Sequence, residues 1–263
     1  MRTLGIDLSA QAKRTATCAI DWSDGRASVE VPHAGADDEA LLAAMREADW
    51  IGIDAPFGWP DAMVRAVGDH AEGRPWPEPA VSPGLRYRAT DWFVQARTAS
   101  NGTGVWPLSV SSDRIAVCAW RCASLLSRFS DSVGRPIDRT GAEMSPGRAL
   151  VEVYPAAALA MWGLASRGYK RTGTGPLEAR RAIVEALSSV AGEALVVDDD
   201  VTAACIGSDD ALDALVASLV ARAAATGDTL VPDDGDLEVA RREGWIHLPE
   251  RDSLARLVGP AGP

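Results

Sequence analysis

Acidic side chains follow two short, nearly identical apolar segments of the chain. Asp7 ends the segment LGID at residues 4–7, and Asp54 ends the segment IGID at residues 51–54. An apolar run of this length fits a strand buried on both faces of a mostly parallel sheet, where a charge is costly unless it is paired. If the two strands are neighbours, both carboxylates meet at one sheet edge, and like charges that close require a cation between them. The pair therefore predicts a metal site, whereas each aspartate alone also fits a cap of the following helix or turn.

A third group of acids lies in the segment SDDALDALVASL at residues 208–219. Asp210 and Asp213 are three residues apart, so a helix places them on one face, whereas Asp209 points elsewhere. Acids in a first helical turn often only complement the helix dipole, which accounts for Asp209 and Asp210. Asp213 lies in the second turn, between apolar residues that pack the helix onto the body. Asp213 is therefore the strongest candidate in this segment.

These candidates depend on the elements that carry them. The segments TLGIDL, TATCAIDW and ASVEVP predict three strands, with a hairpin turn at residues 23–25. A helical pattern at residues 37–48 leads into the IGID strand, and ALVEVYP predicts a further strand before a helix that begins at Pro155. The order indicates an α/β fold with a mixed five-stranded sheet flanked by helices. We expect the first three strands to be antiparallel and the next two to be parallel to the first.

Residues 56–148 interrupt this pattern between the IGID and ALVEVYP strands. We interpret them as an insertion of helices and loops within a single domain that spans residues 1–263. The Pro- and Trp-rich stretch at residues 56–83 is predicted to be an irregular loop. The segment ALVVDDD fits either a short strand or a helix cap. Helical patterns occupy residues 89–97, 115–129, 176–190 and 208–225.

Composition and charge set limits on function. The 263 residues are 47% apolar and 24% charged, as in an ordinary soluble globular chain. No apolar run reaches the ~20 residues of a membrane helix, and the first residues fit a strand rather than a signal peptide, so we expect a cytoplasmic protein. The four cysteines are expected to be reduced thiols. The net charge of −11 argues against a simple nucleic-acid coat, because Lys and Arg carry phosphate binding.

A basic segment interrupts this acidic chain. Residues 84–148 contain nine arginines and five acidic residues, a local charge of +4, whereas the remainder carries −15. The segment fits either a solvated surface or a groove for an anionic substrate. Within it, Arg86, Arg88 and Trp92 offer charge and a stacking ring for a single strand or a nucleotide. The alternative is that Trp92 and Phe93 belong to the core of the inserted helix.

Taken together, these motifs resemble the ribonuclease H-like superfamily, most closely its RuvC-type resolvase branch. The chain is also similar to the predicted-nuclease family catalogued as domain of unknown function 429, in GIDLS, GIDAPFG, the Arg88-x-x-Asp91 pair, EVYP, a following YK, DALDAL and EGWIHLP. The resemblance covers nearly the whole chain. It implies a ribonuclease H-like fold and a two-metal phosphodiester site, in which carboxylates hold Mg²⁺ or Mn²⁺ about 3.5 to 4 Å apart. One ion would activate water and the other would stabilise the leaving oxygen.

The resemblance also implies roles for individual residues. Carried over by position, the metal ligands and catalytic carboxylates are Asp7, Asp54, Asp210 and Asp213. Glu152 is a further catalytic candidate, and a structural salt bridge with Arg88 or Arg148 is an equal alternative. Lys170 of the YK motif joins the substrate-binding candidates Arg86, Arg88 and Trp92.

The substrate class is less defined than the site. Resolvases and ribonucleases H usually surround the site with a Lys-rich surface, whereas this chain has two lysines, Lys13 and Lys170. We therefore expect a single-stranded or branched nucleic acid, or a nucleotide, rather than plain duplex. Actin-like ATPases and sugar kinases share the superfamily core, but DLSAQAK lacks the glycine of their D-x-G-x-T phosphate motif. An ATP-dependent phosphotransferase is one alternative function, and a non-catalytic nucleotide-binding module is another.

Overall fold

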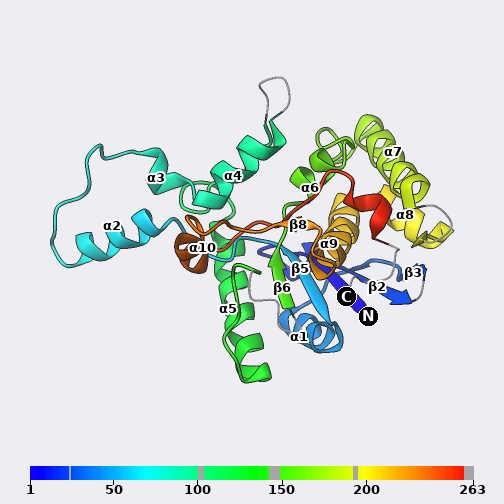
Figure 1. Ribbon diagram of the computed structural model, residues 1–263, viewed down its shortest axis with the longest axis horizontal. Coiled ribbons are helices and arrows are strands. Elements are labelled where there is room, and N and C mark those ends of the chain that lie inside the picture. The colour runs from blue at the N-terminus through cyan, green and yellow to red at the C-terminus, as the bar shows by residue number, and fades with distance from the viewer. Residues whose placement is uncertain (24, 100–103, 142–148, 192–194, 258–263) are drawn as a thin grey trace.

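The centre of the protein is a mixed β-sheet with helices on both faces (Figure 1). The computed structural model describes residues 1–263 except residues 24, 100–103, 142–148, 192–194 and 258–263. The strands of the sheet, in spatial order, are β6 (Ala149–Glu152), β5 (Trp50–Asp54), β1 (Arg2–Asp7), β2 (Ala16–Ser23), β3 (Arg26–Val29) and β7 (Leu195–Val196), and β4 (His33–Ala34) pairs with β2.

The strand directions confirm the predicted α/β fold. β1, β2 and β3 form antiparallel pairs, whereas β5 is parallel to β1 and β6 is parallel to β5. The short strands β4 and β7 extend the expected five-stranded core. In the hairpin between β2 and β3, Ser23 pairs with Arg26, and residue 24 of the predicted turn lies outside the described residues. A separate small sheet joins β8 (Thr229–Leu230) and β9 (Leu248–Pro249).

The predicted helices form close to their expected positions. The helices are α1 (Asp38–Glu47), α2 (Asp61–Ala71), α3 (Pro83–Arg86), α4 (Ala89–Thr98), α5 (Ala116–Val133), α6 (Pro155–Met161), α7 (Thr174–Ala191), α8 (Asp199–Gly207), α9 (Asp209–Ala225) and α10 (Leu237–Glu243), with 3-10 turns η1 (Ala12–Arg14) and η3 (Ser253–Arg256). Ser208 caps α9 by accepting a hydrogen bond from the N–H of Ala211 at 3.3 Å. The ambiguous segment ALVVDDD contains both alternatives, because β7 is followed by Asp198, which caps α8.

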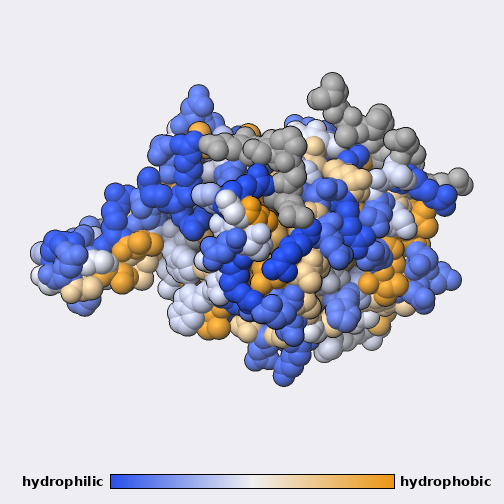
Figure 2. Space-filling model, turned by 90° about the horizontal axis from the view of Figure 1, so that it is seen from below, coloured by the Kyte–Doolittle hydropathy of each residue, from blue (hydrophilic) through white to orange (hydrophobic). Residues whose placement is uncertain are grey.

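The sequence predicted an irregular loop at residues 56–83, but this stretch is partly helical. It contains α2, which projects from the body together with the segment leading to α3 (Figure 1), and the projection is also visible in the space-filling view (Figure 2). Among the residues of α2, all of which are described, only Ala66 is buried. Its apolar residues Met63, Val64 and Val67 recur at helical spacing, so the helix pattern was present in the sequence among the prolines of this stretch.

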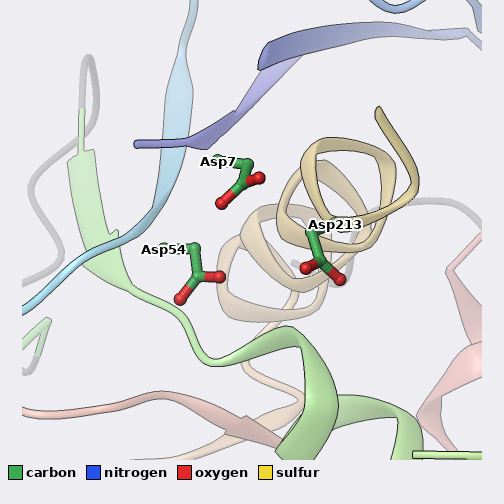
Figure 3. A group of neighbouring side chains, drawn as sticks. All are labelled: Asp7, Asp54 and Asp213. Atoms are coloured by element: carbon green, nitrogen blue, oxygen red, sulfur yellow. The ribbon is translucent and has the colours of Figure 1, made fainter. Parts of the chain in front are cut away.

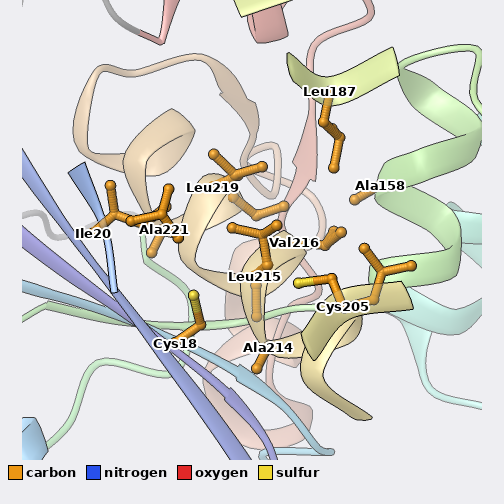
Figure 4. Close-up of a cluster of buried hydrophobic side chains, with 14 of the residues drawn as sticks. Cys18, Ile20, Ala158, Leu187, Cys205, Ala214, Leu215, Val216, Leu219 and Ala221 are labelled. Atoms are coloured by element: carbon orange, nitrogen blue, oxygen red, sulfur yellow. The ribbon is translucent and has the colours of Figure 1, made fainter. Parts of the chain in front are cut away.

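Two hydrophobic cores lie on opposite faces of the sheet. One packs α6, α7, α8 and α9 against β2 and β3, and Figure 4 shows part of it, including Leu215 and Val216 of α9. The other packs α1 and α5 against β1 and β5, through residues such as Ile6 and Ile53. β1 and β5 are consequently buried on both faces, as their apolar runs predicted.

All four cysteines are free thiols, and Cys18, Cys122 and Cys205 are buried. None of the described helices combines the length and the apolarity that crossing a membrane requires.

Candidate metal centre

Asp7 and Asp54 lie side by side at the carboxyl ends of β1 and β5. The two strands pair in parallel, with Gly5 opposite Gly52 and Asp7 opposite Asp54. Because side chains alternate across a strand, each aspartate projects from the same sheet face as the glycine two residues before it. Ile6 projects from the opposite face, into the core with α1 and α5. The spacing Gly-x-Asp thus places both carboxylates on the face that α9 covers.

α9 approaches this face closely because both glycines lack a side chain. A Cβ atom added at Gly5 would lie 1.9 Å from the carbonyl oxygen of Ala214. A Cβ atom added at Gly52 would lie 2.4 Å from the carbonyl oxygen of Ala217. These separations are severe clashes, so this close approach of helix and strands requires glycine at both positions. Asp213 precedes Ala214 on α9, and the same packing brings its carboxylate to the ends of β1 and β5.

The three carboxylates form a compact cluster. One oxygen from each of Asp7, Asp54 and Asp213 lies within 4.8 Å of the other two. Figure 3 shows the three side chains next to one another, carried by β1, β5 and α9. Asp213 is 1% exposed, whereas Asp7 and Asp54 are partly exposed. Carboxylate oxygens are the ligands that hard divalent cations prefer, so the cluster is a possible three-carboxylate metal site. The predicted convergence of these three aspartates is confirmed.

Burial and crowding raise the pKa of each carboxyl group. Burial raises the pKa of Asp7 well above its usual range, and the charges of Asp54 and Asp213 raise it further. Burial also raises the pKa of Asp54 to about 7, although the ammonium of Lys170 opposes this change. The pKa of Asp213 is raised by burial, against the opposing effects of Lys170 and Tyr169. A buried group of like charges favours protonation until a cation balances it, which fits a possible metal site.

The loop between α6 and α7 covers Asp213. The hydroxyl of Tyr169 donates to Asp213 Oδ1 at 2.8 Å, and Lys170 Nζ lies 2.7 Å from Oδ2. Arg180 of α7 is buried, and its Nη1 donates to the carbonyl oxygens of Tyr169 and Arg171 at 2.6 and 3.0 Å. Arg180 therefore fixes the backbone on both sides of Lys170. Lys170 supplies one positive charge to the carboxylates, and the substrate contact expected for it stays a prediction.

Asp7 and Asp54 open into a cleft of about 790 Å³. Its lining also includes the exposed basic side chains of Arg14, Arg114, Arg167, Lys170 and Arg171. Within the described part of the chain, Arg114 has no carboxylate partner. The cleft thus combines a cluster of acids with surrounding bases. This arrangement can hold a cation and attract an anionic substrate to it.

Asp210, the expected fourth ligand, lies outside the carboxylate cluster. Within the described residues the cluster comprises Asp7, Asp54 and Asp213, whereas Asp210 Oδ1 lies 3.6 Å from Arg14 Nη2. Asp210 and Asp213 share a helical face, but three residues of helix separate them by about 4.5 Å along the axis. Asp210 still lines the cleft, and its charge contributes to the raised pKa of Asp7. Asp210 is thus a neighbour of the cluster, and its role as a fourth ligand stays a prediction.

Glu152, the further catalytic candidate, forms a buried ion pair with Arg88. Each side chain is 2% exposed. Arg88 donates to both oxygens of Glu152 at 2.7 and 2.9 Å, to both oxygens of Asp91 at 3.0 and 3.4 Å, and to the carbonyl of Glu243 at 3.1 Å. The backbone N–H of Phe57 also donates to Glu152, at 3.0 Å. All five N–H donors of the guanidinium are therefore engaged, and Arg88 has no donor left for a substrate.

This network bears on two expectations. The buried acids and one carbonyl take up every N–H donor of Arg88, so no donor is left for the predicted substrate contact, although Arg88 and Glu152 both line the cleft. Of the two alternatives for Glu152, the salt bridge with Arg88 is the one that forms, while Arg148 lies outside the described residues. The network joins β6, α4 and α10, so it attaches the helices between β5 and β6 to the sheet.

Trp92 lies on the surface, so its assignment to the core of the inserted helix is wrong. Its side chain is 43% exposed, whereas Phe93 packs against a buried cluster. The ring of Trp92 contacts the rings of Trp106 and Tyr87, with centroid distances of 4.9 and 5.8 Å. Arg86 lies over the ring of Tyr87 at 5.0 Å. The two sequence candidates Arg86 and Trp92 are therefore neighbours within one aromatic cluster.

Several residues of the site were not identified from the sequence. Gly5 and Gly52 determine how closely α9 approaches, and their equal spacing before Asp7 and Asp54 was a visible signal of a shared role. Arg180 had no comparable signal, because the carbonyl groups that it binds are defined only by the folded loop.

Comparison with known proteins gives a family but no characterised relative. Neither the curated proteins nor the solved structures contain a match to this chain. Residues 5–236 match the family described as "Protein of unknown function (DUF429)". The matched span includes the end of β1 with Asp7, the whole of β5 and the whole of α9, and with them every carboxylate of the cluster. Because the match covers most of its length, the chain belongs to the DUF429 family.

Proposed function

We propose that this protein is a metal-dependent nuclease that hydrolyses phosphodiester bonds. The observation that carries the proposal is the cluster of Asp7, Asp54 and Asp213 within 4.8 Å, at the carboxyl ends of two adjacent parallel strands. Ligands of α/β sheets bind at these strand ends. Carboxylates gathered there serve phosphoryl-transfer enzymes as metal ligands. The resemblance of the motifs to the ribonuclease H-like superfamily supports the same function.

The chemistry of the cluster fits Mg²⁺ or Mn²⁺. The three ligand groups are hard oxygen donors, and their raised pKa values reflect negative charge that a divalent ion would neutralise. Asp213 accepts one hydrogen bond or ion pair at each oxygen, and each carboxylate oxygen has a second lone pair available. A bound divalent ion would polarise the phosphate and lower the pKa of attacking water.

The residues around the cluster bind and orient the substrate. Arg14, Arg114 and Lys170 line the cleft beside the acids, so they attract a phosphate group towards Asp7 and Asp54. Arg180 and Tyr169 hold Lys170 at this position through the loop backbone and the contact with Asp213. The acidic remainder of the chain disfavours long contacts with a duplex, so we propose a single-stranded or branched nucleic acid, or a nucleotide, as substrate.

A panel of labelled substrates tests this function. Single-stranded, duplex, hybrid and four-way-junction nucleic acids are incubated with Mn²⁺ and the wild-type protein, and parallel samples contain EDTA. We expect cleavage of at least one substrate, with loss of cleavage in EDTA and in the variants Asp7→Asn and Asp213→Asn. Cleavage that survives both substitutions would come from a contaminant. If no substrate is cleaved, the nuclease proposal fails, and ATP consumption would instead identify a phosphotransferase.

A further inference from the structure

A group of exposed and partly exposed aromatic side chains lies beside the cleft and has no part in the metal centre. Tyr87, Trp92 and Trp106, here called the aromatic platform, have ring-centroid distances of 4.9, 5.1 and 5.8 Å. Trp92 is 43% exposed and Trp106 is 40% exposed, and the neighbouring Leu108 is 42% exposed. Large aromatic rings gain free energy by leaving water, so a group of exposed tryptophans marks a binding surface.

The aromatic platform is connected directly to the cleft. Pro107 and Leu108, which follow Trp106, line the cleft. The hydroxyl of Tyr154, another lining residue, donates to the carbonyl oxygen of Trp106 at 3.3 Å. Arg167, also in the lining, donates to the carbonyl oxygen of Gly104 at 3.0 Å. These contacts hold residues 104–108, here called the platform segment, against the cleft, so one extended ligand can occupy both the platform and the cleft.

Positive charge accompanies the aromatic rings. The guanidinium of Arg86 lies over the ring of Tyr87 at 5.0 Å, and Arg114 and Arg167 line the cleft beside the platform segment. Within the described residues, none of these three arginines has a carboxylate within ion-pair distance. A ligand that matches the combined surface must therefore carry both flat apolar groups and negative charges.

We infer that the aromatic platform stacks the bases of a single-stranded nucleic acid whose phosphates lie along the arginines of the cleft. Every base has a face that can stack on an aromatic ring, and the sugar-phosphate backbone supplies the charges. In a duplex the base faces are covered by neighbouring bases, so the platform has nothing to stack against. This inference deepens the proposed function by naming its substrate class, but it concerns binding and does not depend on turnover.

Fluorescence anisotropy with a short fluorescein-labelled oligothymidine tests the inference in EDTA, where cleavage does not interfere. We expect the variants Trp92→Ala and Trp106→Ala each to weaken binding by about 5- to 150-fold, the range for loss of one stacked base. The conservative variants Trp92→Phe and Trp106→Phe should recover most of the affinity. Trp120→Ala is the matched control, because Trp120 on α5 is 62% exposed and lies outside the platform.

Two further probes separate stacking from charge. An abasic strand of equal length keeps the phosphates but offers no bases, so the wild-type protein should bind it as weakly as the tryptophan variants bind oligothymidine. Arg114→Gln should reduce the salt dependence of the affinity, whereas Trp92→Ala should leave that dependence unchanged. Equal binding of the abasic strand, or of duplex, would overturn the inference. The inference would also fail if Trp92→Ala bound oligothymidine as the wild type does but had a different sedimentation coefficient. That result would make the platform a surface for self-association.

The same experiment keeps this inference distinct from the proposed nuclease activity. If single strands bind through the platform but no substrate is cleaved with Mn²⁺, the platform stands and the catalytic proposal fails. If cleavage occurs but both alanine variants bind and cleave as the wild type does, the catalytic proposal stands and the platform is wrong.

Discussion

Replacing Asp54 by asparagine removes one charge from the carboxylate cluster without changing the shape of the side chain. In the absence of divalent metal, we expect Asp54→Asn to stabilise the protein at neutral pH. The pKa of Asp54 is raised to about 7 from an ordinary 3.8, chiefly by burial. The folded state therefore holds this proton more tightly than the unfolded state does. Its contribution to stability falls as pH rises from about 4 to about 7 and stays constant above that range.

The expected magnitude follows from the same change. At 1.36 kcal/mol for each pH unit, a rise of about 3 units in the pKa corresponds to about 4 kcal/mol above pH 7. Asp54 is partly exposed to the cleft, and the variant also loses the attraction between Asp54 and Lys170. We therefore expect a gain of about 2 kcal/mol, which is about half of the full value. For a chain of this size, such a gain raises the unfolding midpoint by about 4 °C.

Thermal unfolding at pH 5 and pH 8, with EDTA or with Mn²⁺, measures the effect. In EDTA at pH 8 the variant should unfold at a higher temperature than the wild type, and the difference should shrink at pH 5. With Mn²⁺ the order should reverse, because an ion at 100 times its Kd stabilises the wild type by about 2.7 kcal/mol and the variant binds it weakly. Asp131→Asn, an exposed residue of α5, is the control and should change neither midpoint. A variant that is less stable than the wild type in EDTA would refute the reasoning.

Three further predictions concern the packing and charge around the cluster. Gly5→Ala should lower the free energy of unfolding measured in urea by about 3 kcal/mol or more, because the added Cβ atom meets the α9 backbone. The variant should also lose the stabilisation by Mn²⁺. Gly68→Ala, where a Cβ atom has open space, should instead be neutral or stabilising, and equal effects of the two would contradict the close packing. Arg88→Met should cost about 3–5 kcal/mol in urea by leaving buried acids unpaired, whereas Arg86→Met should cost little, and a small effect of Arg88→Met would argue against the network. Lys170→Met should raise the pKa values of the cluster further and lower stability in EDTA at pH 8, and an unchanged pH dependence of unfolding would show that Lys170 does not balance the cluster.

Much of the site could be predicted from local sequence because it depends on the ends and faces of regular elements. Asp7 and Asp54 end twin apolar strands, and the period of two in a strand puts each on the face of its preceding glycine. Asp213 lies in the second turn of a capped helix, among residues that must face the body. Residue type and periodicity therefore predicted that Asp7 and Asp54 meet and marked Asp213 as the candidate of its helix, whereas the family resemblance implied that Asp213 joins the other two.

The partners of the remaining charged groups were decided by tertiary structure. Arg88 and Glu152 are 64 residues apart in the chain, and only the tertiary structure brings the residue before α4 to the end of β6 and makes them a buried pair. Asp210 and Asp213 share one helical face, but they lie at different heights along α9. Only Asp213 is level with the ends of β1 and β5, whereas Asp210 lies beside Arg14. The exposure of Trp92 likewise depends on which side of α4 meets the core.

The sequence by itself determined the fold class, the parallel pairing of the LGID and IGID strands, and the aspartates that meet at their ends. These features depend on periodicity and on residue types within a few positions of one another. Tertiary structure alone decided how closely α9 approaches Gly5 and Gly52, which cation stands beside Asp213, and which charges are paired or exposed. Those outcomes depend on distances between side chains from distant segments, and no local pattern encodes such distances before the elements have packed.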